Sequence, residues 1–139
     1  MLLIGATNCP WDIDDAVMRR FQRRVYIPLP DKNARLALCK NMVSKSNGGI
    51  EMSTKDVNEV AKMTDGFSCS DISSIANEAS FYPLRDVGGI QAIKDIKAAD
   101  VRPIQLKDFK SAILSTKKSV SRELLKRYDE WEEAQSTRG

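Results

Sequence analysis

The chain of 139 residues contains no histidine at all. This absence excludes catalysis by Ser-His-Asp or Cys-His groups and every metal site that needs an imidazole ligand. Cysteine is sparse, because Cys9, Cys39 and Cys69 lie 30 residues apart and form no C-x-x-C pair, which argues against a zinc site. An odd, small number of cysteines is typical of reduced thiols in an intracellular compartment.

Long apolar segments and strong charge are also missing. No run approaches the roughly 18 apolar residues of a transmembrane helix, so we expect no membrane partner. The N-terminal MLLIGATNCPWD has no basic region and becomes acidic early, which is not typical of a signal peptide. A net charge of +3 is too small to indicate nucleic-acid binding by itself. With 42% hydrophobic and 29% charged residues, the composition is that of a globular domain with a modest core.

Two apolar segments near the N-terminus predict β-strands. Residues 2–4 are closed by GATN, which is typical of the end of a strand buried on both faces of a parallel sheet. Residues 25–29 alternate apolar and other residues, which predicts a second short strand. A short helix over residues 12–18, capped by Asp12, is expected between them. Two strands and one helical turn are too few for a complete sheet.

From Asp31 onward the apolar period changes from 2 to 3.6, which predicts helices. Asp31 is expected to cap the first of these helices. Ser53 and Ser68 are each followed three residues later by an aspartate, so we expect both to open helices with capping boxes. Gly66 follows the helix that Ser53 opens, at a position where a left-handed residue is easily accommodated.

The C-terminal half of the chain predicts further helices. Pro83 is expected to end or kink the helix that Ser68 begins. Another helix is predicted near Leu106, and a last one is expected to be capped by Ser119 or Ser121. The predicted fold class is therefore an α/β remnant, made of the last strands of a sheet, followed by an all-α helical domain and a C-terminal helix.

Two segments carry side chains suited to chemistry. Asn8 follows a predicted strand, where ligands bind in open α/β sheets, although an asparagine there can also simply satisfy its own turn. The run Arg19–Arg24 holds four arginines, which fit either a solvated basic face or an arginine finger. A planar, permanently charged guanidinium suits the charge of a phosphoryl-transfer transition state.

The order of these motifs is more informative than any one of them. A strand ending in GATN is followed by MRRFQRRVYIPLPD, by a helix and by GFSCSDI. This order resembles the second half of the AAA ATPase module, over nearly the whole chain. GATN is similar to the sensor-1 strand of that family, RRF to its arginine-finger segment, and GFSCSDI to the start of a lid helix beside the adenine pocket.

The resemblance implies roles for particular residues. Asn8 would orient the attacking water or sense the γ-phosphate, and Arg19 and Arg20 would reach across a subunit interface to the neighbour's ATP. No residue is expected to bind a metal directly. Cys69 stands where the family usually has glycine. The nucleotide-binding residues of the lid would be Gly66, Cys69 and Ser70.

The branch of the family can be narrowed. Paired arginines without an intervening Pro-Gly resemble the branch that contains katanin, spastin, fidgetin and the ESCRT-disassembly vacuolar sorting ATPase. About 20 residues separate Arg85 from Leu106 without strand-like alternation, so the β-rich insertion of the vacuolar sorting group is expected to be absent. The segments DVRPIQLKDF and KKSVSRELLKRYDEW resemble the C-terminal end of the microtubule-severing group, with fidgetin or spastin closest.

The resemblance implies a division of the chain and a function. Residues 1–31 would end the AAA α/β subdomain, 32–118 would form the helical lid, and 119–139 a C-terminal helix with a frayed tail. The intact protein would be a homohexamer that uses ATP and Mg²⁺ to remodel or sever microtubules. Its location would be cytoplasmic, with cytoskeletal association or a nuclear location as further possibilities. The chain holds neither G-x-x-x-x-G-K-[ST] nor an apolar strand ending in Asp-Glu. We therefore expect it to be inactive alone and to bind no cofactor tightly.

Three other functions stay open from the sequence. One is an ATPase of the ESCRT-disassembly vacuolar sorting type. Another is a non-catalytic helical interaction module, which would be a stable monomer with cooperative unfolding. The third is a basic nucleic-acid-binding helical domain that uses Arg19–Arg24, which requires strongly salt-dependent affinity and is disfavoured by the low net charge.

Overall fold

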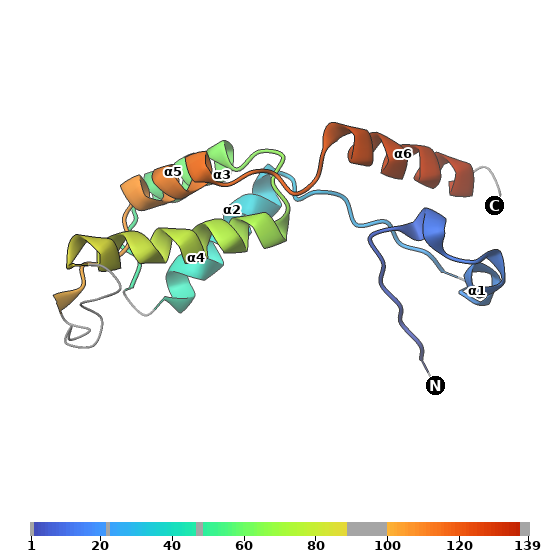
Figure 1. The fold of residues 1–139 in the computed structure, drawn as a ribbon, viewed down its shortest axis with the longest axis horizontal. Coiled ribbons are helices and arrows are strands. Elements are labelled where there is room, and N and C mark those ends of the chain that lie inside the picture. Colours follow the sequence, from blue (N-terminus) through green and yellow to red (C-terminus); the bar gives the residue numbers. More distant parts are fainter. Residues whose placement is uncertain (1, 22, 47–48, 89–99, 137–139) are drawn as a thin grey trace. The chain divides into compact units, whose positions relative to one another are not determined.

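The computed structural model describes residues 2–21, 23–46, 49–88 and 100–136. Contacts divide the chain into a terminal unit, Met1–Pro28 with Ser121–Gly139, and a central unit, Leu29–Val120. The elements in chain order are a 3-10 turn η1 (Pro10–Asp12) and the helices α1 (Asp15–Arg20), α2 (Lys32–Lys45), α3 (Thr54–Met63), α4 (Cys69–Asp86), α5 (Leu106–Ser115) and α6 (Arg122–Ser136) (Figure 1).

The two predicted strands do not form in the part of the chain that the structure describes. Residues 2–4 and 25–29 have no regular secondary structure. Large apolar side chains in these segments are 69–85% exposed: Leu2, Leu3, Ile4, Val25 and Ile27. A strand needs a hydrogen-bonded neighbour, and the β pairing of the described residues is limited to one parallel bridge between Ile50 and Ile104. The two strands of the predicted α/β remnant are therefore not seen, and the described part of the chain is all-α.

The predicted helix starts of the central unit are confirmed. The Asp31 carboxylate accepts the backbone N–H of Ala34 at 2.7 Å at the start of α2. Capping boxes open α3 at Ser53 and α4 at Ser68, each with the aspartate three residues later. Such a cap stabilises a helix by about 1 kcal/mol. These local hydrogen bonds fix where each helix begins, independently of the packing around it.

Three helix boundaries differ from the predictions or refine them. The first helix is capped by Asp14, not Asp12, because Pro10–Asp12 form a separate 3-10 turn. Helix α4 does not end at Pro83, which is buried within it, but continues to Asp86. Of the two serines predicted to cap the last helix, Ser121 does so, since its hydroxyl accepts the N–H of Leu124 at 3.1 Å.

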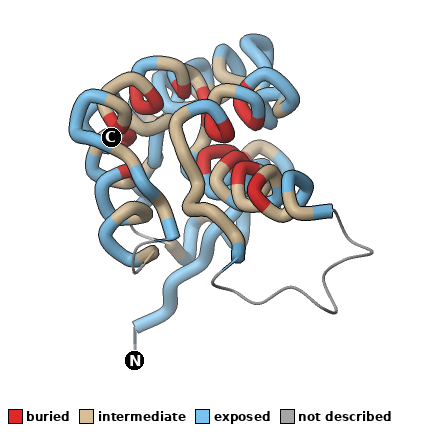
Figure 2. The backbone as a smooth tube through the Cα atoms, turned by 90° about the vertical axis from the view of Figure 1, so that its left-hand side faces the viewer, coloured by how far each residue is buried: buried red, intermediate tan, exposed pale blue. Residues whose placement is uncertain are grey.

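The central unit has a hydrophobic core where α3, α4 and α5 meet. Helix α4 packs on α5, and α3 contacts both α2 and α5. The core side chains that are at most 2% exposed include Cys39, Val60, Ile72, Ile75, Ala79, Phe109 and Ala112. Figure 2 shows buried positions in red on neighbouring turns of these helices, whereas the N-terminal segment is pale blue. The 3.6-residue apolar period found from Asp31 onward therefore corresponds to helices that bury apolar side chains in one core.

A buried arginine joins α2 to the end of α3. Arg35 is 6% exposed, and its Nε donates to the carbonyl of Ala61 at 2.9 Å. The same guanidinium donates to the carbonyl of Pro30 at 2.9 Å and pairs with Asp65 at 2.9 Å. Because its donors face these acceptors, Arg35 is a structural residue and lies outside the predicted functional site.

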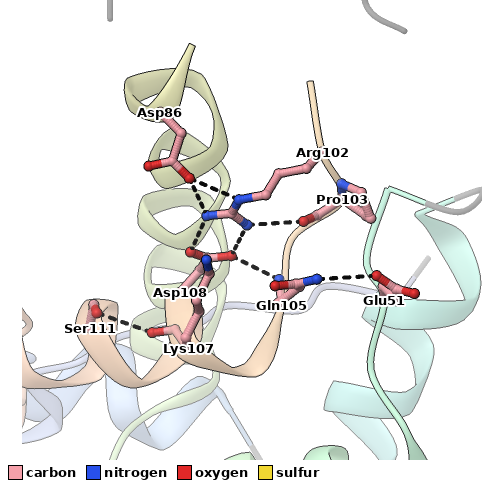
Figure 3. Close-up of polar contacts among 8 residues, drawn as sticks. All are labelled: Glu51, Asp86, Arg102, Pro103, Gln105, Lys107, Asp108 and Ser111. Atoms are coloured by element: carbon pink, nitrogen blue, oxygen red, sulfur yellow. Dashed lines mark hydrogen bonds and ion pairs between the residues drawn. The ribbon is translucent and has the colours of Figure 1, made fainter. Parts of the chain in front are cut away.

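Arg102 joins the C-terminal end of α4 to the N-terminal end of α5 (Figure 3). Its guanidinium donates two hydrogen bonds to the Asp108 carboxylate, at 2.7 and 2.9 Å, and pairs with Asp86 at 2.7 Å. Asp108 also accepts the backbone N–H of Gln105 at 2.8 Å and is 3% exposed. Burial raises the pKa of Asp108, but the hydrogen bonds from Arg102 and Gln105 outweigh it and hold the pKa below its ordinary value of 3.8.

This arrangement predicts that the central unit loses stability in acid. Because the pKa of Asp108 is lower in the folded than in the unfolded chain, its contribution is complete at neutral pH and is lost as the pH falls below about 3.8. Unfolding by urea at pH values from 6 to 2 measures this loss. Asp108→Asn should be less stable at pH 6 and have a flatter pH dependence, whereas exposed Asp100→Asn should follow the wild-type curve.

Candidate functional site

In the terminal unit, helix α6 holds the segment that contains Asn8. The Asn8 side chain is exposed, and its backbone carbonyl accepts a hydrogen bond from the Tyr128 hydroxyl. The Tyr128 ring lies 5.1 Å from the Trp11 ring and is stacked on Tyr26 at 5.7 Å between centroids. The Arg127 guanidinium lies over the Trp11 ring, 4.0 Å from its centroid. Tyr128 therefore positions the backbone at Asn8. The sequence did not predict this contact, because the two residues are 120 positions apart.

Tyr128→Ala is expected to release this segment from α6. The substitution removes two ring contacts and the hydrogen bond to Asn8, so Trp11 should become more exposed to water. In a Trp131→Phe background, where Trp11 is the remaining tryptophan, its fluorescence emission should shift to longer wavelength. Lys126→Ala on the same helix is the matched control and should leave the emission unchanged. An unshifted Tyr128→Ala spectrum would contradict the positioning role.

Arg19 and Arg20 form the last turn of α1, and both are exposed. Neither makes a hydrogen bond or an ion pair with the described residues, so both guanidiniums can accept an outside anion. Arg24 differs, because it donates to the carbonyl of Met18 at 3.0 Å and to the side chain of Gln135. The structure thus separates Arg24, which bonds other parts of the chain, from Arg19, Arg20 and Arg23, which are exposed and have no such bond to the described residues.

Arg19 also borders a cavity of about 450 Å³ in the terminal unit. Most of its other lining residues come from η1, α1 and α6, and they include Trp11, Asp15, Met18 and Trp131. Mixed apolar and charged walls of this kind suit a protein segment or an aromatic group more than a bare anion.

The predicted nucleotide-binding residues of the central unit lie together at the start of α4. Gly66 has a φ of +75°, a conformation that favours glycine, and a Cβ there would lie 2.7 Å from Lys118 Nζ. Cys69 and Ser70 are exposed in the first turn of the helix. The Lys118 ammonium lies 5.3 Å from the centre of the Phe67 ring. This corner therefore combines exposed first-turn residues with a nearby cation.

The family resemblance predicts that these residues form one wall of a nucleotide site. The glycine turn and the first helical turn can approach a base or a ribose, and the cysteine at position 69 keeps its side chain at the surface. The sequence supplies no phosphate-binding loop. Among the described residues, no group of three acidic or cysteine side chains could hold a metal ion. Asn8, Arg19 and Arg20 lie in the other unit, and the roles predicted for all six residues remain predictions.

None of the helices in the described ranges is long and apolar enough to cross a lipid bilayer. The expected absence of a β-rich insertion between Arg85 and Leu106 falls largely on residues 89–99, which lie outside the described residues, as do residues 137–139 of the predicted tail.

Two family models match the chain. A model described as an AAA+ lid domain matches residues 55–110, and one described as the Vps4 C terminal oligomerisation domain matches residues 90–134. The first range contains nearly all of α3 and the whole of α4, with the predicted nucleotide-binding residues, and the second reaches through most of α6.

Curated relatives match almost the whole chain. Spastin of Naegleria gruberi is 40% identical over 137 residues, which are 99% of this chain and 26% of the relative. Spastin of Homo sapiens is 40% identical over 131 residues, which are 94% of this chain and 21% of the relative. The chain therefore spans about a fifth to a quarter of the length of these relatives.

Solved structures are similar over the same range. The crystal structure of the FIGL-1 AAA domain has a TM-score of 0.82 at 31% identity, covering 94% of this chain and 42% of that one. The same domain was also solved in complex with ADP. A structure described as the basis for katanin self-assembly has a TM-score of 0.71 at 30% identity, covering 90% of this chain and 44% of that one.

Proposed function

Since the chain belongs to the C-terminal lid region of the spastin, fidgetin-like and katanin branch of the AAA proteins, we propose that it serves an ATPase that severs microtubules. The observation that carries the proposal is the pair of unpaired arginines at the end of α1, in a chain 40% identical to spastin. In this proposal residues 1–31 complete the nucleotide-binding subdomain, 32–118 form the lid, and 119–139 support assembly.

Each predicted site residue has a part in this function. Asn8 orients the attacking water or senses the γ-phosphate, while Arg19 and Arg20 reach the nucleotide of the neighbouring subunit. Gly66, Cys69 and Ser70 contact the nucleotide beside its base. Bound ATP with Mg²⁺ supplies the phosphoanhydride whose hydrolysis drives remodelling of the polymer. The ADP complex of the FIGL-1 AAA domain supports nucleotide binding by the intact protein.

A homohexamer is the proposed assembly. The match to an oligomerisation model over residues 90–134 and the likeness to a self-assembling katanin support an oligomer. Exposed arginines with no partner among the described residues fit this proposal, because fingers supplied in trans need an acceptor in another subunit. The proposed polymer is tubulin, and the proposed location is cytoplasmic, with cytoskeletal or nuclear association as alternatives.

A chimera tests the proposal directly. The 131 matched residues of Homo sapiens spastin are replaced by those of this chain, and the chimera is mixed with fluorescent microtubules and ATP. We expect ATP hydrolysis and loss of filament fluorescence. Unmodified spastin and spastin lacking the matched segment are the controls. A chimera that assembles and binds nucleotide but neither hydrolyses ATP nor severs filaments would refute the proposal.

A second candidate function is a helical interaction module. The observation that favours it is the core of the central unit, which is built from side chains of Leu29–Val120 alone. In this case the chain by itself would be a monomer that unfolds cooperatively, and the chimera would lack activity. Sedimentation of the isolated chain, together with its unfolding curve, separates this candidate from the first.

A further inference from the structure

One serine joins the segment between α5 and α6 to the start of α4. The Ser119 hydroxyl donates to the Asp71 carboxylate at 3.0 Å, and its backbone N–H lies 3.3 Å from the same oxygen. That oxygen also accepts the backbone N–H of Ser68 at 2.9 Å, as part of the capping box of α4. One carboxylate oxygen therefore holds both the helix start and a segment 48 residues away.

The Asp71 carboxylate is ionised at neutral pH. It is 8% exposed, and burial raises its pKa, but the hydrogen bonds from Ser68 and Ser119 outweigh burial and hold the pKa below the ordinary value. Its negative charge is balanced by hydrogen-bond donors, since no cationic side chain forms an ion pair with it in the described chain. The link therefore depends on the Ser119 hydroxyl remaining a donor.

Ser119 also has the surroundings of a kinase substrate. It is exposed, and it lies in a segment without helix or strand. Lys117 and Lys118 precede it directly, and both are exposed. Protein kinases choose substrates partly by charge pattern, and a pair of lysines before a serine suits kinases with an acidic peptide-binding groove.

We propose that Ser119 is a phosphorylation site for a serine kinase that selects preceding basic residues, and that phosphorylation separates residues 116–120 from α4. The kinase transfers the γ-phosphoryl group of ATP to Ser119 Oγ. The bond between Pγ and the bridging oxygen breaks, a phosphate ester forms, and ADP and the hydroxyl proton leave. The proposal goes beyond the proposed ATPase function and does not rest on it, because both partners lie within the central unit.

The physical effect follows from the geometry of the link. A phosphate ester at Oγ no longer donates a hydrogen bond to Asp71, and it places a charge of about −1.5 to −2 beside a carboxylate. Like charges at hydrogen-bond distance repel, so the ester leaves the start of α4. The Ser68 hydroxyl lies 3.4 Å from the Ser119 hydroxyl, and either of the two can be the donor. Phosphorylation of Ser119 therefore also alters this contact.

Ser121 provides an internal contrast. Its hydroxyl accepts the N–H of Leu124 at the start of α6, and it follows the same two lysines. A phosphate at a helix N-terminus is favourable, because it meets unpaired N–H groups and the positive end of the helix dipole. Phosphorylation of Ser121 is therefore expected to stabilise its helix, whereas phosphorylation of Ser119 breaks a link.

The first experiment asks whether the phosphate is transferred to Ser119. The purified chain is incubated with the catalytic subunit of cAMP-dependent protein kinase and ATP, and phosphopeptides are mapped by mass spectrometry. We expect phosphate on Ser119, with a several-fold slower rate in a chain carrying Lys117→Gln and Lys118→Gln. Phosphate on Ser121 but not on Ser119, or an unchanged rate in the lysine variant, would overturn the proposal.

A second experiment measures the consequence without a kinase. In the Ser119→Glu chain, backbone amides at the start of α4 and at residues 119–120 should exchange hydrogen about tenfold faster, as expected for the loss of one hydrogen bond to a charged group. Adding Asp71→Asn should restore slow exchange, because the repulsion is removed. Ser121→Glu should leave these amides unchanged. Equal exchange in Ser119→Glu and wild type would overturn the switch.

Discussion

Replacing Arg19 or Arg20 by alanine in the assembled protein is expected to abolish ring-dependent ATP hydrolysis while each subunit still binds nucleotide. Arginine fingers in other NTPases increase the rate by a factor on the order of 10³–10⁵, so the loss should be of this size. The expectation rests on two exposed guanidiniums at the end of α1 that have no hydrogen-bond partner among the described residues. Because neither side chain bonds another residue in the described ranges, their loss should leave the fold intact.

Matched variants separate a specific role from a general effect of charge. Arg23→Ala removes the same charge from an exposed position nearby and should hydrolyse ATP almost as fast as wild type. Arg19→Lys keeps the charge but loses the planar fork, so it should recover only part of the activity. Hydrolysis is measured against protein concentration, and nucleotide binding with a fluorescent ATP analogue. Near wild-type hydrolysis in both alanine variants would remove Arg19 and Arg20 from the site.

Features encoded by neighbouring residues could be predicted from the sequence. The caps at Asp31, Ser53 and Ser68 are local, because each side chain bonds a backbone N–H three residues away. The positive φ of Gly66 follows from the same kind of local reasoning. The order of these signals, together with GATN and RRF, was enough to indicate the AAA lid and its branch.

Features that depend on distant partners could not be predicted. Residues 2–4 read as a strand by composition, but a strand exists only where another strand pairs with it. The link from Ser119 to Asp71 spans 48 residues, and no spacing rule connects the two. The sequence did carry one overlooked signal for the Arg102 contact. Gln105 and Asp108 have capping-box spacing, which marks the carboxylate to which Arg102 binds.

The apolar face of α5 carries the largest expected effect on stability. Phe109 is 2% exposed, and its ring is part of the core formed with α3 and α4. Phe109→Ala removes most of a large side chain from a close-packed interior and leaves a cavity that the neighbours fill only in part. The expected loss in the free energy of unfolding is about 3–5 kcal/mol.

Leu114 on the same helix is the matched control, because it is 85% exposed. Leu114→Ala should change the free energy of unfolding by less than about 0.5 kcal/mol. Equilibrium unfolding in urea, followed by helical circular dichroism, measures both variants. Since total stabilities of small domains are about 5–15 kcal/mol, the Phe109 variant should lose a large fraction of its stability and unfold at a clearly lower urea concentration than wild type. Equal unfolding midpoints for the two variants would mean that α5 does not form the core that its 3.6-residue periodicity indicates.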